Sequence, residues 1–154
     1  MCIRDSPKPV KQITIYTDGG CNPNPGPGGW AALLIYKNQE RVLTGAKRST
    51  TNNQMELTAA LEALRALKIP CNVRLHTDSA YMMNAFDKKW LVQWQKNGWV
   101  TAARNPVKNK ELWLALLEES HRHNITWIKV KAHADNQHNN RVDRLATAAR
   151  LELN

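Results

Sequence analysis

The sequence predicts an α/β protein whose five-stranded mixed sheet has helices on both faces. The first observation is the alternation of apolar and polar residues over Gln12–Thr17, which is typical of a strand. The second is an amphipathic helix over Asn52–Lys68 that lies between strand-like segments. The third is the order of all predicted elements, βββαβαααβα, which describes a mixed α/β sheet. With 154 residues, 42% of them hydrophobic, the chain suits one domain with a hydrophobic core.

The domain is expected to begin after a short N-terminal extension. Residues 1–10 contain two prolines and show no periodicity, so they are predicted to be a disordered or non-native extension. The domain itself is assigned to residues 11–154. In its first strand, Ile13 and Ile15 share one face, and the alternation indicates a strand that is buried on that face alone.

The remaining elements follow from runs of apolar residues and from the residues that interrupt them. Asn38 marks the turn between the second and third strands, Thr51–Asn53 are candidate caps of the first helix, and Pro70 follows its end. The predicted elements after the first strand are strands at Trp30–Lys37 and Arg41–Lys47, the helix Asn52–Lys68, a strand at Asn72–Asp78, helices at Ser79–Phe86, Trp90–Lys96 and Lys108–His123, a strand at Asn124–Val130 and a helix from about Asn140 to Leu151.

Charge and composition restrict the class of function. Twenty-two Lys and Arg residues against 13 Asp and Glu give a net charge of +9, which favours a polyanionic partner, although many small proteins are simply basic. The three cysteines match no metal-ligand spacing and no disulfide framework, so a reducing cytoplasm is expected. No apolar run is long enough for a membrane span, and no membrane association is expected.

Two aspartates follow strand-like segments. Asp18 ends the first strand and Asp78 the fourth, and a crossover helix between the strands would allow them to lie parallel and adjacent. Their carboxylates would then share one edge of the sheet, where they repel each other unless a cation lies between them. Each also has a structural explanation, because Asp18 precedes two glycines and Asp78 precedes a helix that it could cap. The sequence leaves both explanations open.

A third carboxylate lies on the apolar face of a helix. Glu56 is in line with Ala60 and Ala63, and an acidic group on a buried stripe is costly unless it is compensated. The alternative is an interaction with the helix dipole in the first turn, which explains the turn but not the face. Asp143 lies at the border of an apolar stripe, in the expected first turn of the last helix, and spacing gives it no priority over Asp135.

Four motifs in order carry a family resemblance. The segments TDGGCNPNPGPGGW, TTNNQMEL, TDSAY and KAHADNQHNNRVDRLA together resemble type 1 ribonuclease H, over about residues 12–150. The resemblance implies the ribonuclease H-like fold and a sequence-nonspecific endonuclease that hydrolyses the RNA strand of RNA–DNA hybrids. The implied products carry 5′-phosphate and 3′-hydroxyl ends. A monomer is expected.

The resemblance also implies the catalytic residues. The implied quartet is Asp18, Glu56, Asp78 and Asp143, which would hold two Mg²⁺ ions, with Mn²⁺ as a substitute. His133, in the loop before the last helix, resembles the family's proton-shuttling histidine, and its ordinary pKa suits that role. Asn139 resembles the asparagine that helps to position the attacking water.

Substrate-binding residues are implied in three groups. Cys21, Asn24, Asn52 and Asn53 match positions that face the RNA minor groove. The segment with Lys88, Lys89, Trp94, Lys96 and Trp99 resembles a basic protrusion, the handle, for which the alternative is a helix with solvated lysines and tryptophans in the core. Thr51 and Trp94 resemble members of a pocket for a DNA-strand phosphate.

Other functions on the same fold are weighed against this one. A catalytically silent nucleic-acid-binding module would be favoured by the loss of a quartet carboxylate, and none is lost. A related nuclease of the integrase or resolvase type would differ in acidic spacing and would lack the handle. Departures from the family pattern occur at Ala80, Gln93 and Ala132, and they leave substrate affinity and loop dynamics open while the residues of the chemistry are kept.

Overall fold

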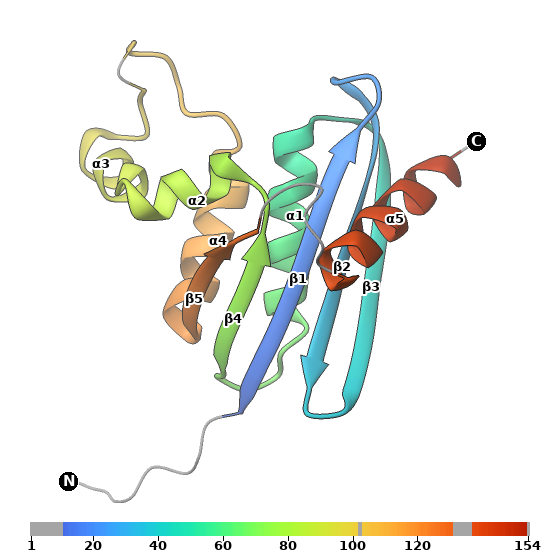
Figure 1. The fold of residues 1–154 in the computed structure, drawn as a ribbon. Coiled ribbons are helices and arrows are strands. Elements are labelled where there is room, and N and C mark those ends of the chain that lie inside the picture. Colours follow the sequence, from blue (N-terminus) through green and yellow to red (C-terminus); the bar gives the residue numbers. More distant parts are fainter. Residues whose placement is uncertain (1–10, 102, 131–136, 154) are drawn as a thin grey trace, which may run out of the picture.

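A computed structural model describes residues 11–101, 103–130 and 137–153. The five-stranded sheet has the order β3-β2-β1-β4-β5, with β1, β2 and β3 antiparallel and β4 and β5 parallel to β1 (Figure 1). The predicted mixed sheet is therefore confirmed. Its strands are β1 (Gln12–Cys21), β2 (Gly26–Tyr36), β3 (Gln39–Thr50), β4 (Asn72–Thr77) and β5 (Asn124–Lys129).

The helices cover both faces of the sheet. In Figure 1, α1 and α4 lie on one face and α5 crosses the other, while α2 and α3 extend to the side of β4 and β5. The helices are α1 (Asn52–Arg65), α2 (Ala80–Asp87), α3 (Trp90–Asn97), α4 (Lys110–Arg122) and α5 (Gln137–Leu151). Among the described helices, none is both long and apolar enough to cross a membrane.

The first strand is fully buried on one face and partly buried on the other, so the expected half-buried strand is confirmed, and α5 packs on its second face. Ile13 and Ile15 belong to the larger core cluster beneath α1 and α4, while Tyr16 packs against a second cluster that includes Val142 and Ala146 of α5. Alternation in the sequence indicates which residues are polar but not which are covered. Tyr16 has a polar hydroxyl and an apolar ring, and the ring packs under α5. β1 is thus the central strand of a sheet with a core on each side.

Two helix boundaries bear on the site. α1 begins as expected, because the Thr51 hydroxyl accepts a hydrogen bond from the Gln54 N–H at 3.1 Å as its N-cap. α5, however, begins at Gln137 rather than near Asn140. Its first turn is polar and gives no apolar periodicity, so the sequence contains no signal for it.

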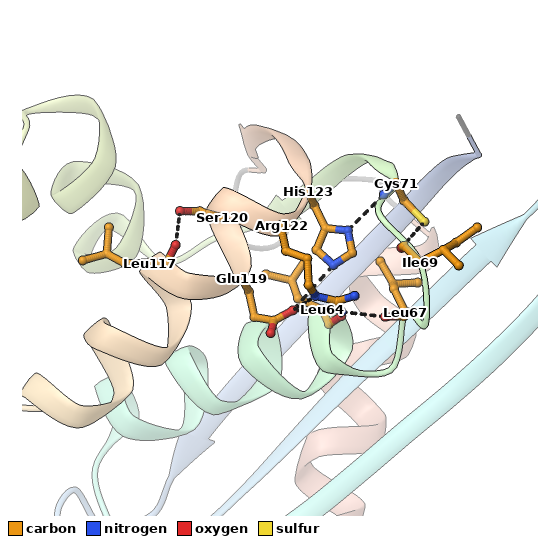
Figure 2. Close-up of polar contacts among 9 residues, drawn as sticks. All are labelled: Leu64, Leu67, Ile69, Cys71, Leu117, Glu119, Ser120, Arg122 and His123. Atoms are coloured by element: carbon orange, nitrogen blue, oxygen red, sulfur yellow. Dashed lines mark hydrogen bonds and ion pairs between the residues drawn. The ribbon is translucent and has the colours of Figure 1, made fainter. Parts of the chain in front are cut away.

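A polar cluster attaches the end of α4 to the end of α1 and the start of β4 (Figure 2). The Arg122 Nη2 donates to the carbonyl oxygens of Leu67 at 2.6 Å and Leu64 at 3.2 Å, at a helix end where the Leu64 carbonyl also accepts from the Leu67 N–H. The buried His123 accepts a hydrogen bond from the Cys71 N–H at 3.0 Å through Nδ1, and burial lowers the pKa of its ring. These contacts hold the helix layer against the parallel half of the sheet.

The tryptophans of the basic segment pack on one another. The Trp94 ring lies 6.0 Å from Trp90, 5.9 Å from Trp99 and 5.8 Å from Trp113, measured between ring centroids. Trp113 of α4 is fully buried, so this aromatic cluster fixes α3 to the core. The tryptophans therefore pack into the core, which is the structural explanation that the sequence left open. The lysines around them remain exposed on the surface of this cluster.

Candidate active site

The parallel pairing of β1 and β4 brings two carboxylates to one edge of the sheet. The last paired residues are Tyr16 and His76, so Asp18 and Asp78 each lie two positions beyond the end of this pairing. With Glu56 of α1 they form a cluster in which one carboxylate oxygen from each residue lies within 4.8 Å of the others. The expected convergence of these three side chains is confirmed.

Purely structural roles do not account for the three acids. Asp18 lies inside β1 and pairs with Ala31 of β2 rather than forming a turn, because β1 continues to Cys21. Asp78 is not the cap of α2, since Ser79 is the N-cap and its hydroxyl accepts from the Met82 N–H at 3.1 Å. Glu56 lies outside the first turn of α1, so the expectation that placed it there was wrong and the helix-dipole explanation weakens.

The close approach of β1 and α1 depends on Gly19. A Cβ atom on this residue would lie 2.6 Å from the Met55 carbonyl oxygen and 2.8 Å from the Glu56 nitrogen, both in the backbone. Neither neighbour can move without shifting α1 itself. The glycine after Asp18 therefore permits the contact that places Glu56 beside it.

Burial and mutual repulsion shift the pKa values of the cluster. Burial, followed by the charges of Asp78 and Asp143, raises the pKa of Asp18 to about 8. Burial also raises the pKa of Glu56 to about 7, against a hydrogen bond from the Ser79 hydroxyl. Among the described residues that shift the pKa values of Asp18 and Glu56, none is a Lys, Arg or His. Such an all-oxygen donor set fits a hard divalent cation, which would relieve the repulsion.

Asp143 reaches the same cluster from α5. Asp143 is exposed, and it forms a hydrogen bond with the Asp18 carboxyl that raises the pKa of Asp18. The expected first-turn position was wrong, because α5 begins at Gln137 and has no acidic residue in its first turn. Asn139, expected in the loop, is instead in the first turn of α5 and only 5% exposed. The expected role of His133 falls outside the described residues.

These side chains line one cavity of about 370 Å³. Asp18, Glu56, Asp78, Asp143 and Asn139 contribute to its wall, and so does Arg150 in the last turn of α5. The sequence reasoning missed Arg150 and Ser79. Nothing distinguishes Arg150 among the 22 basic residues of the chain, whereas Ser79 could have been identified as a helix cap next to Asp78.

Of the residues expected to face the RNA, Cys21 and Asn52 line the cavity, and Asn24 and Asn53 lie beside Asn52. The Cys21 N–H donates to the Asn52 Oδ1 at 2.8 Å, and the Asn52 N–H donates to the Asn24 Oδ1 at 3.2 Å. The alternative of N-capping does not apply to Asn52, because Thr51 is the cap. Asn53 is exposed next to it in α1. The side chain of Asn52 thus holds the glycine-rich turn against the start of α1.

The residues of the expected handle lie on α2, α3 and the segments around them. Lys88, Lys89 and Lys96 are exposed, whereas Trp94 and Trp99 are half-buried in the aromatic cluster. A chain of contacts connects this cluster to the start of α1, and its links are Gln54 to Asn109 at 3.2 Å, Asn109 to the Tyr81 hydroxyl at 3.4 Å and Trp113 to the same hydroxyl at 3.1 Å. The handle and the start of α1 are therefore joined through α4.

Comparisons with known proteins agree with this geometry. The ribonuclease H family model matches residues 10–150. The ribonuclease H of Moorella thermoacetica is 56% identical over 140 residues, covering 91% of this chain and 92% of its own. That of Symbiobacterium thermophilum is 54% identical and covers 91% and 95%.

Solved structures show the same fold. LC9-RNase H1, described as a type 1 RNase H with the type 2 active-site motif, superposes with a TM-score of 0.84 at 26% identity, covering 97% of this chain and 76% of that one. LC11-RNase H1, solved in complex with an RNA/DNA hybrid, superposes with a TM-score of 0.70 at 21% identity, covering 91% and 97%, and shows the likeness of fold alone. The chain therefore belongs to the ribonuclease H family, as a type 1 member.

Proposed function

We propose that this protein is a sequence-nonspecific endonuclease that hydrolyses the RNA strand of RNA–DNA hybrids. The observation that carries the proposal is the cluster of Asp18, Glu56 and Asp78 in a cavity that Asp143 also lines. Burial and the neighbouring carboxylates raise the pKa values of Asp18 and Glu56, and a bound divalent cation would relieve this repulsion. Together with membership of the family, this arrangement favours catalysis over a silent binding module on the same fold.

The four carboxylates are proposed to hold two Mg²⁺ ions, for which Mn²⁺ could substitute. Bound Mg²⁺ would supply Lewis-acid activation of water and neutralise charge on the scissile phosphate. Asp18 is the central ligand, since its carboxyl lies next to both Asp78 and Asp143. The Ser79 hydroxyl, hydrogen-bonded to Glu56, orients that carboxylate.

The remaining steps are assigned to residues that position water and move protons. Asn139, buried in the first turn of α5 and lining the cavity, is proposed to position the attacking water. His133 is proposed to transfer a proton to or from this water, since an imidazole titrates close to neutral pH. Attack on the phosphorus with departure of the 3′-oxygen leaves a 5′-phosphate and a 3′-hydroxyl.

Recognition of the hybrid is proposed to divide between two surfaces. Cys21, Asn24, Asn52 and Asn53 lie at or beside the rim of the cavity, where the RNA minor groove and its 2′-hydroxyls would lie. The exposed lysines of the handle are proposed to contact DNA-strand phosphates, which carry no sequence information. A protein that contacts backbone and sugars in this way selects the type of duplex rather than its sequence.

Substitution of one carboxylate tests the proposal. Asp78→Asn should reduce single-turnover cleavage of a hybrid by at least about a thousandfold while leaving hybrid binding intact, because the quartet acts on the reacting phosphate. Asp87→Asn, at an exposed position of α2, is the matched control and should retain cleavage. Cleavage by Asp78→Asn at the rate of the control would refute the proposed catalytic site.

A further inference from the structure

Arg150 gives the catalytic cavity a positive end. It is half-buried in the last turn of α5, and it is the one basic side chain among the described residues that line this cavity. Asp143 lies seven residues earlier on the same helix, which separates the two positions by about 10 Å along its axis. Thr147, between them on α5, also lines the cavity. The cavity therefore offers a cation site at one end and an anion site at the other.

The position of Arg150 is set by a close contact between α5 and β2. A Cβ atom on Gly29 would lie 2.7 Å from the Arg150 nitrogen and even closer to the Ala146 carbonyl oxygen. Because these are backbone atoms, the last turns of α5 can approach the sheet only where β2 has a glycine. Arg150 thus projects from a helix end held against the sheet. Burial raises the pKa of the nearby Cys21 thiol, and the charge of Arg150 is close enough to oppose part of that rise.

A second arginine continues the positive surface outside the cavity. Arg150 also lines a neighbouring depression of about 300 Å³, together with Pro27, Leu151, Leu153 and the exposed Arg48 of β3. Among the described residues that line this depression, none is acidic. In Figure 1, α3 and the C-terminal end of α5 lie on opposite sides of β1 and β4. The positive surface at the end of α5 is therefore on the side away from the handle.

We propose that Arg150, extended by Arg48, binds the phosphates of the RNA strand next to the scissile phosphate, on the side away from the handle. This inference rests on the proposed function, because the strand that enters the carboxylate cavity is the RNA strand. A guanidinium group can contact two oxygens of one phosphate, so it fixes the strand in register as well as attracting it. The RNA would then be held beside the reacting bond by Arg150 together with the rim residues Cys21 and Asn52, which line the same cavity.

The first test measures hybrid binding in EDTA as a function of salt concentration. Arg150→Gln should weaken binding roughly tenfold and reduce the slope of log K against log salt by about one, the value expected when one phosphate is no longer neutralised. Arg144→Gln is the matched control, since this exposed arginine is on the same helix, six residues earlier and on a different face. Arg150→Lys should recover the slope while binding less tightly than the wild type. Arg150→Met, which keeps the apolar stem and removes the charge, replaces Arg150→Gln if that variant does not fold.

The second test locates the phosphate. Single methylphosphonate linkages, which are uncharged, are placed in turn along the RNA strand and along the DNA strand. At one RNA linkage beside the scissile phosphate, wild-type protein and Arg150→Gln should bind equally well, because the linkage no longer carries the charge that Arg150 recognises. Equality at a DNA-strand linkage instead, or a constant difference at every linkage, would overturn the inference.

The outcomes separate this inference from the proposed activity. Cleavage of hybrid by the wild type with identical binding by Arg150→Gln and Arg144→Gln would refute the role of Arg150 and leave the activity standing. Hybrid binding that depends on Arg150 without any cleavage would support the binding site and refute the activity. Absence of hybrid binding by the wild type would refute both.

Discussion

Asp18 illustrates what a single side chain costs the fold at this site. Its pKa of about 8 in the folded protein is far above the value of 3.8 for an unperturbed aspartate, because burial and neighbouring carboxylates disfavour its charge. Between these two pH values the unfolded chain is ionised while the folded protein keeps the proton. The contribution of Asp18 to stability is therefore complete below about pH 4 and is lost as the pH rises toward 8.

Asp18→Asn should stabilise the protein in the absence of divalent cations. We expect the free energy of unfolding in EDTA to rise by about 2 kcal/mol at pH 8, with little change at pH 4. The whole pKa shift would correspond to about 6 kcal/mol at about 1.4 kcal/mol per pKa unit, and the expected gain is smaller because Asp18 shares its proton with Asp143. Urea denaturation at both pH values measures this. An equal change at the two pH values would contradict the assigned cause, and Mg²⁺ should stabilise the wild type more than the variant.

At the scale of elements, the helix layer depends on the contact between α4 and the end of α1. Arg122→Met should cost about 1–2 kcal/mol, because the Leu64 and Leu67 carbonyls lose a charged donor while the apolar stem is kept. Arg65→Met is the control, as its 3.9 Å ion pair with Glu62 is exposed and should contribute little. Thermal unfolding of both variants checks this, and equal melting temperatures would contradict it.

The elements also show which parts of the structure were predictable. The strands and α1 were found because their apolar residues recur with the period of the element, and Thr51 was found because a hydroxyl before a helix is a common cap. The start of α5 was missed because its first turn is polar, and the course of β1 beyond Thr17 was missed because glycines follow. Both misses fall at the site, where residues serve a ligand rather than the core.

Some long-range contacts of the site could be predicted from the sequence, and others could not. Asp18 and Asp78 could be paired because the ends of adjacent parallel strands share an edge, and Glu56 because it faces inward from its helix. Asp143 could not be ranked from spacing, since its contact with Asp18 depends on where α5 crosses the sheet. Arg150 depends on the same crossing and on Gly29, which no local pattern reveals.

For the whole molecule, the net charge of +9 is expected to act through a few surfaces rather than uniformly. Replacing Lys88, Lys89 and Lys96 with Gln should weaken hybrid binding and reduce its salt dependence by roughly one unit of slope for each phosphate that the variant no longer neutralises. The aromatic cluster beneath these residues is untouched by the change, so the fold should be retained.

The control for this change neutralises three other exposed basic residues. Lys37, Arg74 and Arg144 line neither the catalytic cavity nor the depression beside it, and their replacement with Gln leaves the same net charge as the handle variant. Binding titrations at several salt concentrations compare the two. Equal slopes for both triple variants would remove the handle from substrate binding.

The most direct test of the account is cleavage of end-labelled RNA in three forms: in an RNA–DNA hybrid, in an RNA duplex and as a single strand. Each is incubated with the protein in Mg²⁺ and again in EDTA. Cleavage confined to the hybrid and abolished by EDTA is the predicted result, because the carboxylate cavity needs a cation and its rim is expected to sense one RNA and one DNA strand. Intact RNA in every lane, with the hybrid nevertheless bound, would contradict the account and leave a nucleic-acid-binding module.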